Sequence, residues 1–380
     1  MPLYKWDGIC YSSHRMDFMS PVNRYFPYRF RGMALSLGCI ILLPVLLGCG
    51  ALKAINPPSA TPTSSMTPTS TATPTPTPTL TPTPTERPVL CGGPPVMFIL
   101  LIGSDARRDS YAVGLADSIR LVRVDFIEPR IQLLAFQRDL YVEIPGIANH
   151  NGITHGKLNQ AFLYGNPGYG YYDSPRQGPG LLALTLEHNF GAQVDHYAAV
   201  NLQAFVRIVD ALDGIDIELP YTVDGRVKGS KDSSRYFGAG DLHLNGYRTM
   251  LLARMRPLGD FQRSGVQDLI LQALAEEVLS PTVIPKLPEL VDALRGSTQT
   301  DLGAAEASQL LCLAAMLEPQ KIEFVSFPET LFKSERVHDP VLGNTSILSA
   351  NFEVLKMYVQ KFKDGAWLEP EGNLPDPISP

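Results

Sequence analysis

The chain has 380 residues, of which 44% are apolar and 18% are charged, and its formal net charge is −6. This length allows a sizeable core in one large or two modest domains. The negative balance excludes bulk attraction to nucleic acid, so any polyanionic partner has to be met by a local cluster of basic side chains.

Residues 1–33 are predicted to be a cytoplasmic or leader segment, and Met33 is a candidate for the true start. An apolar run at 34–52 follows and is long enough to span a bilayer, while the arginines in front of it place the N-terminus inside. Alternatively, Leu46-Leu47-Gly48-Cys49 resembles a lipobox, which would make Cys49 a lipid attachment site. A buried core helix is the weakest interpretation, because a Pro-rich segment follows at once. Both leading interpretations attach the protein to the cell membrane and export the remainder.

Residues 53–95 are predicted to be an extracytoplasmic stalk, because the segment from 57 to 88 is almost wholly Pro, Thr and Ser. This composition cannot bury a core and favours polyproline II. At about 3.1 Å per residue the stalk could hold a domain up to roughly 100 Å from the membrane.

Apolar runs of strand and helix length alternate from residue 96 to residue 365, and a short tail follows at 366–380. The run 96–102 is continuous and predicts a central strand buried on both faces. Further strands are predicted at 118–126, 130–136, 196–200, 215–219 and 322–327, with a hairpin-like turn at Glu128-Pro129-Arg130. Helices are predicted at 181–189, 202–212, 261–279 with Asp260 as its cap, and 302–317. This alternation predicts an α/β fold with a mixed central sheet flanked by helices.

Two carboxylates follow or begin these predicted strands. Asp105 comes after the first strand and a Gly-Ser turn, so it is expected at the carboxyl edge of the sheet, where ligand sites of α/β proteins lie. Asp117 stands at the start of the next strand. Two such carboxylates can hold a magnesium ion that also contacts phosphate oxygens, although each one alone is more often a turn or cap residue.

Later arginines predict an anionic partner rich in phosphate. Arg254 and Arg256 alternate ahead of Pro257 and Gly259, so an extended segment would point both the same way. Arg263 and Gln267 are four residues apart and share one face of the next predicted helix. Guanidinium groups bind phosphate with two parallel hydrogen bonds, whereas lysine acts as a point charge.

Two of the five cysteines, Cys91 and Cys312, lie outside the leader. In an oxidising compartment such a pair is read as one disulfide, and two unpaired thiols are the alternative. The helix at 302–317 has to pack on the sheet, because Leu310, Leu311, Leu313 and Leu317 are expected to be buried. This packing would bring Cys312 to the start of the strand 96–102.

Other reaction classes lack their motifs. His150 and His155 flank a loop without a third ligand at metal spacing, so they are interpreted as turn residues. The sequence contains neither a Gly-x-Ser-x-Gly elbow nor a phosphate-binding P-loop.

Several segments together resemble the LytR-CpsA-Psr family of cell-wall glycopolymer phosphotransferases, in order and in spacing, from about Val96 to Phe362. They are Phe98-Ile99-Leu100-Leu101-Ile102-Gly103-Ser104-Asp105, Arg138-Asp139-Leu140-Tyr141-Val142, Lys157-Leu158-Asn159, Asp213-Gly214-Ile215-Asp216-Ile217 and His243-Leu244-Asn245-Gly246. The leader, anchor and stalk are similar to those of the family as well.

The resemblance implies an α/β fold with a deep apolar pocket for a polyprenyl chain and a catalytic domain at 96–365. The helices predicted at 181–189 and 202–212 are expected to build this pocket. It implies transfer of a glycopolymer from a polyprenyl pyrophosphate carrier to a hydroxyl of peptidoglycan or another wall acceptor. By motif match, Asp105 and Asp117 would bind Mg²⁺, for which Mn²⁺ could substitute. The pyrophosphate would be held by Arg138, Lys157, Arg254, Arg256, Arg263 and Gln267, and the residues expected to act in catalysis are Asp105, Asp117, Arg138 and Arg256.

The sequence departs from the family pattern at two places. Leu115-Ala116 stand where the family usually has Arg-Ser, and Gln137 stands where it usually has Pro. Arg107 or Arg108 could supply the missing positive charge beside the metal. Two further functions stay open: a polyprenyl pyrophosphatase with water as acceptor, and a lipid-binding wall-attached module whose catalysis has lapsed.

Overall fold

A computed structural model describes residues 87–107, 111–227, 232–256, 259–294, 298–339 and 341–367. The predicted leader, the anchor, most of the stalk and the tail from residue 368 lie outside these ranges. Within them, no helix has both the length and the apolar character that crossing a membrane requires.

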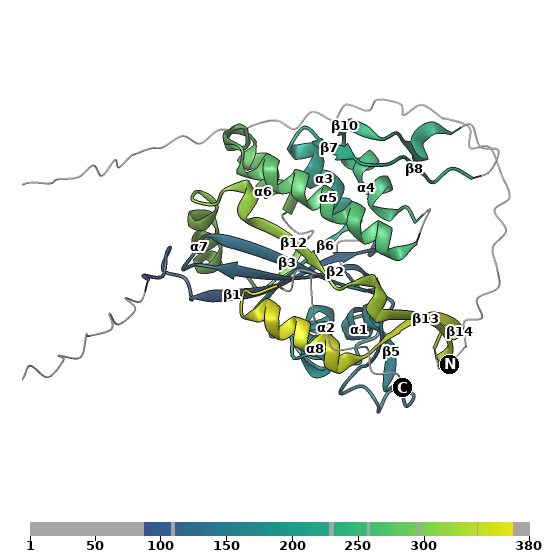
Figure 1. Ribbon diagram of the computed structural model, residues 1–380. Helices are drawn as coiled ribbons and strands as arrows, with labels where there is room; N and C mark the ends of the chain where they lie inside the picture. Colours follow the sequence, from purple (N-terminus) through teal and green to yellow (C-terminus); the bar gives the residue numbers. More distant parts are fainter. Residues whose placement is uncertain are drawn as a thin grey trace, which may run out of the picture. The chain divides into compact units, whose positions relative to one another are not determined.

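A mixed sheet of six strands forms the centre of the fold (Figure 1). β1 pairs with β2 antiparallel and with β6 parallel, and β3 pairs with β2 antiparallel and with β12 parallel. The carboxyl ends of β1, β3, β6 and β12 therefore meet the amino end of β2 at one edge. In spatial order the strands are β11 (Thr298–Thr300), β6 (His196–Asn201), β1 (Val96–Ser104), β2 (Ala116–Asp125), β3 (Arg130–Phe136) and β12 (Ile322–Ser326).

Helices cover both faces of this sheet (Figure 1). One face carries α1 (Leu158–Gly165), α2 (Gln177–Phe190) and α8 (Phe352–Lys363). The other carries α3 (Leu202–Ala211), α4 (Gly246–Arg254), α5 (Asp260–Leu279), α6 (Leu287–Leu294) and α7 (Ala304–Ala314). The structure thus confirms the predicted α/β class.

Successive side chains of β1 pack against the helices on opposite faces of the sheet. Phe98, Leu100 and Ile102 are buried with residues of α1, α2 and α8, while Met97 and Ile99 pack with Leu313 of α7. Successive side chains of a strand point to opposite faces, so a continuous apolar run has to be covered twice. The predicted central strand is confirmed.

Smaller elements surround the two layers. Among the described residues, four two-stranded ribbons are formed by β4 (Tyr141–Glu143) with β5 (His155–Lys157), β7 (Ile215–Leu219) with β10 (Gly240–Leu244), β8 (Val223–Asp224) with β9 (Tyr236–Phe237), and β13 (Phe332–Asp339) with β14 (Gly343–Ala350). Short 3₁₀ helices lie at Ser233–Arg235, Pro281–Lys286, Pro319–Lys321 and Glu329–Leu331. The strand predicted at 215–219 therefore exists, but it belongs to a ribbon and not to the central sheet.

Two predicted element ends are wrong. The N-cap of α5 is Gly259, with a φ of 111°, and Asp260 is already the first helical residue. The helix predicted at 302–317 is shorter in the structure, since α7 ends at Ala314. Leu311 is 69% exposed whereas Leu313 is 1% exposed, so one of the four leucines expected to be buried faces outward.

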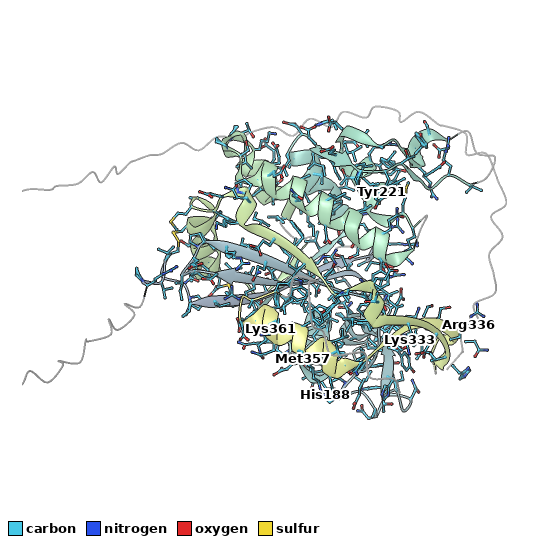
Figure 2. The ribbon with its side chains drawn as sticks, viewed as in Figure 1. His188, Tyr221, Lys333, Arg336, Met357 and Lys361 are labelled. Atoms are coloured by element: carbon cyan, nitrogen blue, oxygen red, sulfur yellow. A yellow bond between two sulfur atoms is a disulfide. The ribbon has the colours of Figure 1, made fainter. Side chains whose placement is uncertain are left out.

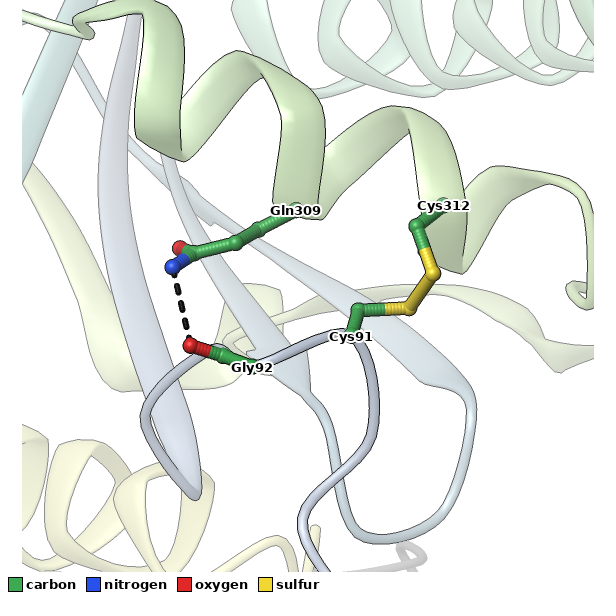
Figure 3. The surroundings of a disulfide bond; sticks show 4 residues. All are labelled: Cys91, Gly92, Gln309 and Cys312. Carbon is green, nitrogen blue, oxygen red and sulfur yellow. Dashed lines mark hydrogen bonds between the residues drawn. A yellow bond between two sulfur atoms is a disulfide. The ribbon is translucent and has the colours of Figure 1, made fainter. Parts of the chain in front are cut away.

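The predicted disulfide between Cys91 and Cys312 is present, with its two Cα atoms 5.8 Å apart (Figure 3). It joins the segment that precedes β1 to α7. Gln309, one helical turn before Cys312, donates a hydrogen bond of 3.0 Å from Nε2 to the carbonyl oxygen of Gly92. The start of the domain is thus held to α7 both covalently and by a hydrogen bond.

Replacing Cys312 with Ala should lower the free energy of unfolding by about 2–5 kcal/mol, because the bond closes a long loop in the unfolded chain. Chemical denaturation of the variant and of the parent protein measures the loss. In peptide mapping without reduction, a free thiol at both Cys91 and Cys312 in the parent protein would contradict the pairing.

Candidate functional site

A cavity of about 380 Å³ lies between the central sheet and helices α3, α4 and α5. Its floor is formed by the ends of β1, β2 and β6, and its walls by Phe205 and Ile208 of α3, Met250 of α4 and one face of α5. The cavity thus lies at the sheet edge where the carboxyl ends of β1 and β6 meet the amino end of β2.

Its lining changes from polar to apolar along α5. Arg263 and Gln267 come from the first two turns of the helix, and Ile270, Leu271 and Leu274 come from the following turns. At 1.5 Å per residue the lining part of the helix is about 16 Å long. The cavity therefore combines a basic, polar end with an apolar length, which suits a ligand that has an anionic head and a hydrocarbon chain.

The two predicted acids lie close together at the polar end. Asp117 lines the cavity. Burial, together with the charge of Asp117, raises the pKa of the Asp105 carboxyl above its ordinary value, although the Leu115 amide and the charges of Arg254 and Arg107 oppose this. The backbone N–H of Leu115 donates to Asp105 Oδ1 at 2.6 Å and fixes that carboxylate.

Two carboxylates close together in a partly buried place repel each other, and a divalent cation bound between them offsets this repulsion. Asp105 and Asp117 are therefore suited to bind a divalent cation. In the described part of the chain no group of three or more acidic, histidine or cysteine side chains could hold a metal. Mg²⁺ commonly uses only one or two carboxylates and completes its shell with water and substrate phosphates. Asp105 and Asp117 are therefore the candidate ligands.

An ion-pair chain extends from Asp117 away from the cavity. Arg138 donates from Nη1 to Asp117 Oδ1, and its Nε lies 3.3 Å from Asp139 Oδ2. Lys157 Nζ in turn donates to Asp139 Oδ1 at 3.0 Å. Because these four side chains are mostly buried, the chain fixes the orientation of Asp117 and Arg138.

Arg254 and Arg256 line the cavity together, although Arg254 is the last residue of α4 and not part of an extended segment. Met255 between them is extended, with φ −74° and ψ 144°, and its side chain is buried. Gln267 Nε2 donates to the carbonyl oxygen of Ala253 at 3.1 Å, which ties α5 to the end of α4. The two arginines thus lie on the same side, as predicted, but one of them is helical and only the residue after it is extended.

The structure gathers most of the predicted site residues in one place. Asp117, Arg254, Arg256, Arg263 and Gln267 line the cavity, and Asp105 interacts with Asp117 and Arg254. Arg138 and Lys157 do not line it, and they join it only through the ion-pair chain.

The expectation that the helix at 181–189 would help to build the pocket is wrong. This helix, α2, packs with α1 and α8 on the opposite face of the sheet, and Leu181, Leu182 and Leu186 are buried there. Of the two helices expected to line the pocket, only α3 does so, together with α4 and α5.

Two arginines escaped the sequence analysis. A hollow of about 410 Å³ adjoins the cavity and shares Arg254 and Arg256 with it, and it is also lined by Arg226 and Arg235 of the β8–β9 region. Arg226 is paired with Asp224 at 2.8 Å. Nothing in the sequence connected Arg226 and Arg235 with the other arginines of the site, because only the fold brings the ribbon β8–β9 beside the end of α4.

Together these features define an α/β protein with an amphipathic cavity, apolar along its length and basic at its mouth. Residues 94–361 match the model of the LytR_cpsA_psr family, and the chain belongs to this family.

Curated relatives include the regulatory protein MsrR of Staphylococcus aureus (strain COL), 31% identical over 212 residues, which cover 54% of this chain and 56% of MsrR. The polyisoprenyl-teichoic acid–peptidoglycan teichoic acid transferase TagV of Bacillus subtilis (strain 168) is 25% identical over 231 residues, 60% of this chain and 55% of TagV. The chain thus matches little more than half the length of these relatives.

Among solved structures, B. subtilis TagV superposes with a TM-score of 0.54 at 24% identity, over 72% of this chain and 98% of TagV. TagT bound to LIIa-WTA superposes with a TM-score of 0.51 at 19% identity, over 71% of this chain and 90% of TagT. These superpositions show a shared fold.

The carboxylate pair predicts a stabilising effect of Mg²⁺. At ten times its dissociation constant, Mg²⁺ should raise the free energy of unfolding of the parent protein by about 1.4 kcal/mol. Asp105→Asn should lose this gain but stay folded, because its side-chain oxygen can still accept the hydrogen bond from Leu115. Thermal unfolding with and without Mg²⁺ measures both effects, and an undiminished gain in the variant would contradict the assignment of Asp105.

Proposed function

We propose that this protein is an extracytoplasmic phosphotransferase that moves a glycopolymer from a polyprenyl pyrophosphate carrier to a hydroxyl of the cell wall, with assistance from Mg²⁺. The observation that carries the proposal is the change in the lining of one cavity, from arginines and a carboxylate at the sheet edge to apolar side chains along α5.

The apolar part of the cavity suits the polyprenyl chain. Phe205, Ile208, Ile270, Leu271 and Leu274 offer hydrocarbon surface from two helices. Each methylene removed from water contributes about 0.8 kcal/mol, so even a part of a long prenyl chain would bind firmly.

The polar end suits the pyrophosphate. Arg254, Arg256 and Arg263 can each offer paired N–H donors to phosphate oxygens, and Gln267 adds an amide. Arg138, which is held between Asp117 and Asp139, would contribute its charge at the same edge, and Lys157 would support it through Asp139.

The reaction requires an acceptor oxygen to attack the phosphorus that carries the glycan. A new P–O bond forms to the acceptor, the bond from that phosphorus to the bridging oxygen breaks, polyprenyl phosphate leaves, and the hydroxyl proton is released. The arginines offset charge on the bridging and leaving oxygens, while the cavity positions the carrier for in-line attack. Mg²⁺ held by Asp105 and Asp117 would supply further positive charge to the phosphate oxygens.

The departure from the family pattern at Leu115-Ala116 does not prevent positive charge from offsetting the charge of the phosphates and carboxylates at this site. Leu115 contributes its backbone N–H to Asp105, which does not depend on its side chain. Arg107 is close enough for its charge to lower the pKa of the Asp105 carboxyl. Arg108, the other candidate substitute, lies outside the described residues.

The names of the relatives support the proposal to different degrees. TagV is named as a teichoic acid transferase and TagT is described as bound to LIIa-WTA, whereas MsrR is named as a regulatory protein. The Cys91–Cys312 disulfide suits an oxidising compartment outside the cytoplasm, and the predicted anchor at 34–52 or lipidated Cys49 would keep the protein at the membrane.

The full-length protein should release polyprenyl phosphate from a polyprenyl-pyrophosphate-linked glycan in the presence of Mg²⁺, and it should attach the glycan to a wall acceptor. Arg254→Lys should lower this rate by about 10²-fold, since lysine keeps the charge but cannot form two parallel hydrogen bonds. Arg336→Lys on the β13–β14 hairpin, away from the cavity (Figure 2), is the matched control and should keep the parental rate.

Three outcomes of this assay separate the candidate functions. Release that depends on the acceptor supports the transferase. Equal release with and without acceptor indicates a pyrophosphatase, and no release together with bound lipid indicates a binding module without catalysis.

The purified protein should also retain a polyprenyl phosphate or pyrophosphate that mass spectrometry detects. Ile208→Glu should abolish retention, because a buried charge without a partner opposes an apolar ligand. Met357→Glu on the outer side of α8 (Figure 2) changes a solvent-exposed apolar residue in the same way and should retain the lipid. Equal lipid content in the two variants would argue against this cavity as the lipid site.

A further inference from the structure

A second cleft lies on the other side of α5. It has a volume of about 340 Å³ and is formed by the start of α5, by Gln137 after β3, and by the loop that follows β12, with Trp367 at its border. None of its lining residues lines the cavity described above. We refer to it as the β12 cleft.

The sheet places the β12 cleft beside the proposed reaction site. Gln137 immediately precedes Arg138, whose guanidinium holds Asp117 at the mouth of the cavity. The strand order β1-β2-β3-β12 separates the end of β12 from the start of β2 by two strand spacings, about 10 Å. On α5, Ser264 and Asp268 border the cleft, and their neighbours Arg263 and Gln267 border the cavity.

Gln137 lines this cleft without a partner from the protein. The residue is only 5% exposed, and its side-chain amide forms no hydrogen bond within the described part of the chain. Its amide atoms stay accessible from the cleft, so they can form hydrogen bonds with a ligand there. An amide offers two donors and an acceptor, which matches the hydroxyls of a polar ligand.

The two polar residues of α5 that line the cleft are held in place by Arg120. Arg120, which is almost fully buried, donates from Nη2 to Asp268 Oδ1 at 2.8 Å and lies 3.2 Å from the hydroxyl oxygen of Ser264. This network fixes two polar lining residues of α5 in place. The ligand therefore meets a preformed surface.

The chemistry of the lining points to a neutral sugar. Phe261 and Trp367 offer aromatic surface, Gln137 offers its amide, and Glu329 offers a carboxylate at the rim. None of the residues that line the cleft is basic, and Arg120 already neutralises Asp268, so a phosphate-bearing polymer would meet the carboxylate of Glu329 at the rim and no basic lining residue. Aromatic faces with a few placed hydrogen-bonding groups are typical of sites for uncharged polar molecules that have apolar faces.

We infer that the β12 cleft binds an uncharged saccharide unit of the wall glycan that accepts the polymer, and that it directs the acceptor hydroxyl toward the Asp117–Arg138 pair. The inference rests on the proposed transferase function. It assigns opposite sides of α5 to the two substrates, with the carrier lipid in the cavity and the acceptor sugar in the cleft.

Binding can be measured without any donor. Trp6 and Trp367 are the two tryptophans of the chain, so Trp6→Phe leaves Trp367 as the only fluorophore of its kind. Titration of this full-length variant with a β-1,4-linked N-acetylglucosamine tetrasaccharide should give a saturable change in fluorescence. Adding Gln137→Leu should weaken binding about tenfold, because at least one hydrogen bond to the ligand is lost.

Matched variants guard against a folding defect. Gln203→Leu changes an exposed glutamine of α3 that borders neither site and should leave the affinity unchanged. Glu329→Ala at the exposed rim should weaken binding several-fold, and Glu335→Ala on β13 should not. If the Gln137 variant does not fold, the comparison of Glu329→Ala with Glu335→Ala decides the question.

Three results would overturn the inference: no saturable signal, equal affinity of the cleft variants and their controls, or binding of a free wall stem peptide in place of the sugar. A transfer assay separates this inference from the proposed function. If the protein transfers the glycan but binds no saccharide in the cleft, the proposed transferase function stands and only the assignment of the cleft is refuted. Saccharide binding that depends on Gln137, without transfer to any wall glycan, refutes the acceptor role and the transferase, although the sugar site itself remains.

Discussion

One edge of the central sheet determines where the polar residues of the candidate site lie. The parallel pairs β1–β6 and β3–β12, joined through the reversed strand β2, bring four carboxyl ends and one amino end to that edge. A polar side chain placed after a buried strand cannot be covered by the apolar layer, so the edge collects Asp105, Asp117 and Arg138. The apolar cavity has its polar mouth there because α5 runs from this edge over the sheet.

Sequence reasoning located the strands of this edge because their apolar runs are long and continuous. The strand predicted at 130–136 has the same bounds as β3, and Val96–Ser104 extends the predicted first strand by two residues. Burial on both faces leaves a continuous apolar run, which its short length and the turn residues at its ends identify as a strand. The predicted acids and most of the predicted arginines consequently appear in one place.

The same reasoning failed where burial is one-sided or weak. α4 is short and carries Arg248, Thr249 and Arg254 among its apolar residues, so the sequence indicated a helix ahead of Pro257 but not its bounds. β13 alternates polar and charged side chains and is mostly exposed, which hides a strand from an analysis based on apolar runs. α2 was assigned to the wrong face, because an amphipathic helix shows that it packs but not against which side of a sheet. The cleft beside Gln137 could not be foreseen either, since it joins residues more than two hundred positions apart.

Some of the segments that resemble the family stabilise the fold and do not line the cavity. His243 Nδ1 lies 2.8 Å from Asp216 Oδ1 across the β7–β10 ribbon, and Nε2 of the same ring lies 3.0 Å from the carbonyl oxygen of Asp213. Asn245 caps α4 by accepting a hydrogen bond from the backbone N–H of Arg248. These contacts begin the helix whose last residue, Arg254, enters the cavity, so the motif acts on the site from a distance.

The disulfide between Cys91 and Cys312 also has a mechanical meaning. It closes a covalent ring that contains β1, β2, β3, β6 and helices α1 to α6, and hence every residue that lines the cavity beside α5. Tension applied between the two ends of the chain would bypass this ring through the sulfur–sulfur bond and act on the residues after Cys312. Those residues include β12, the loop beside Gln137 and Trp367. Tension along the chain would therefore deform the β12 cleft before the cavity beside α5.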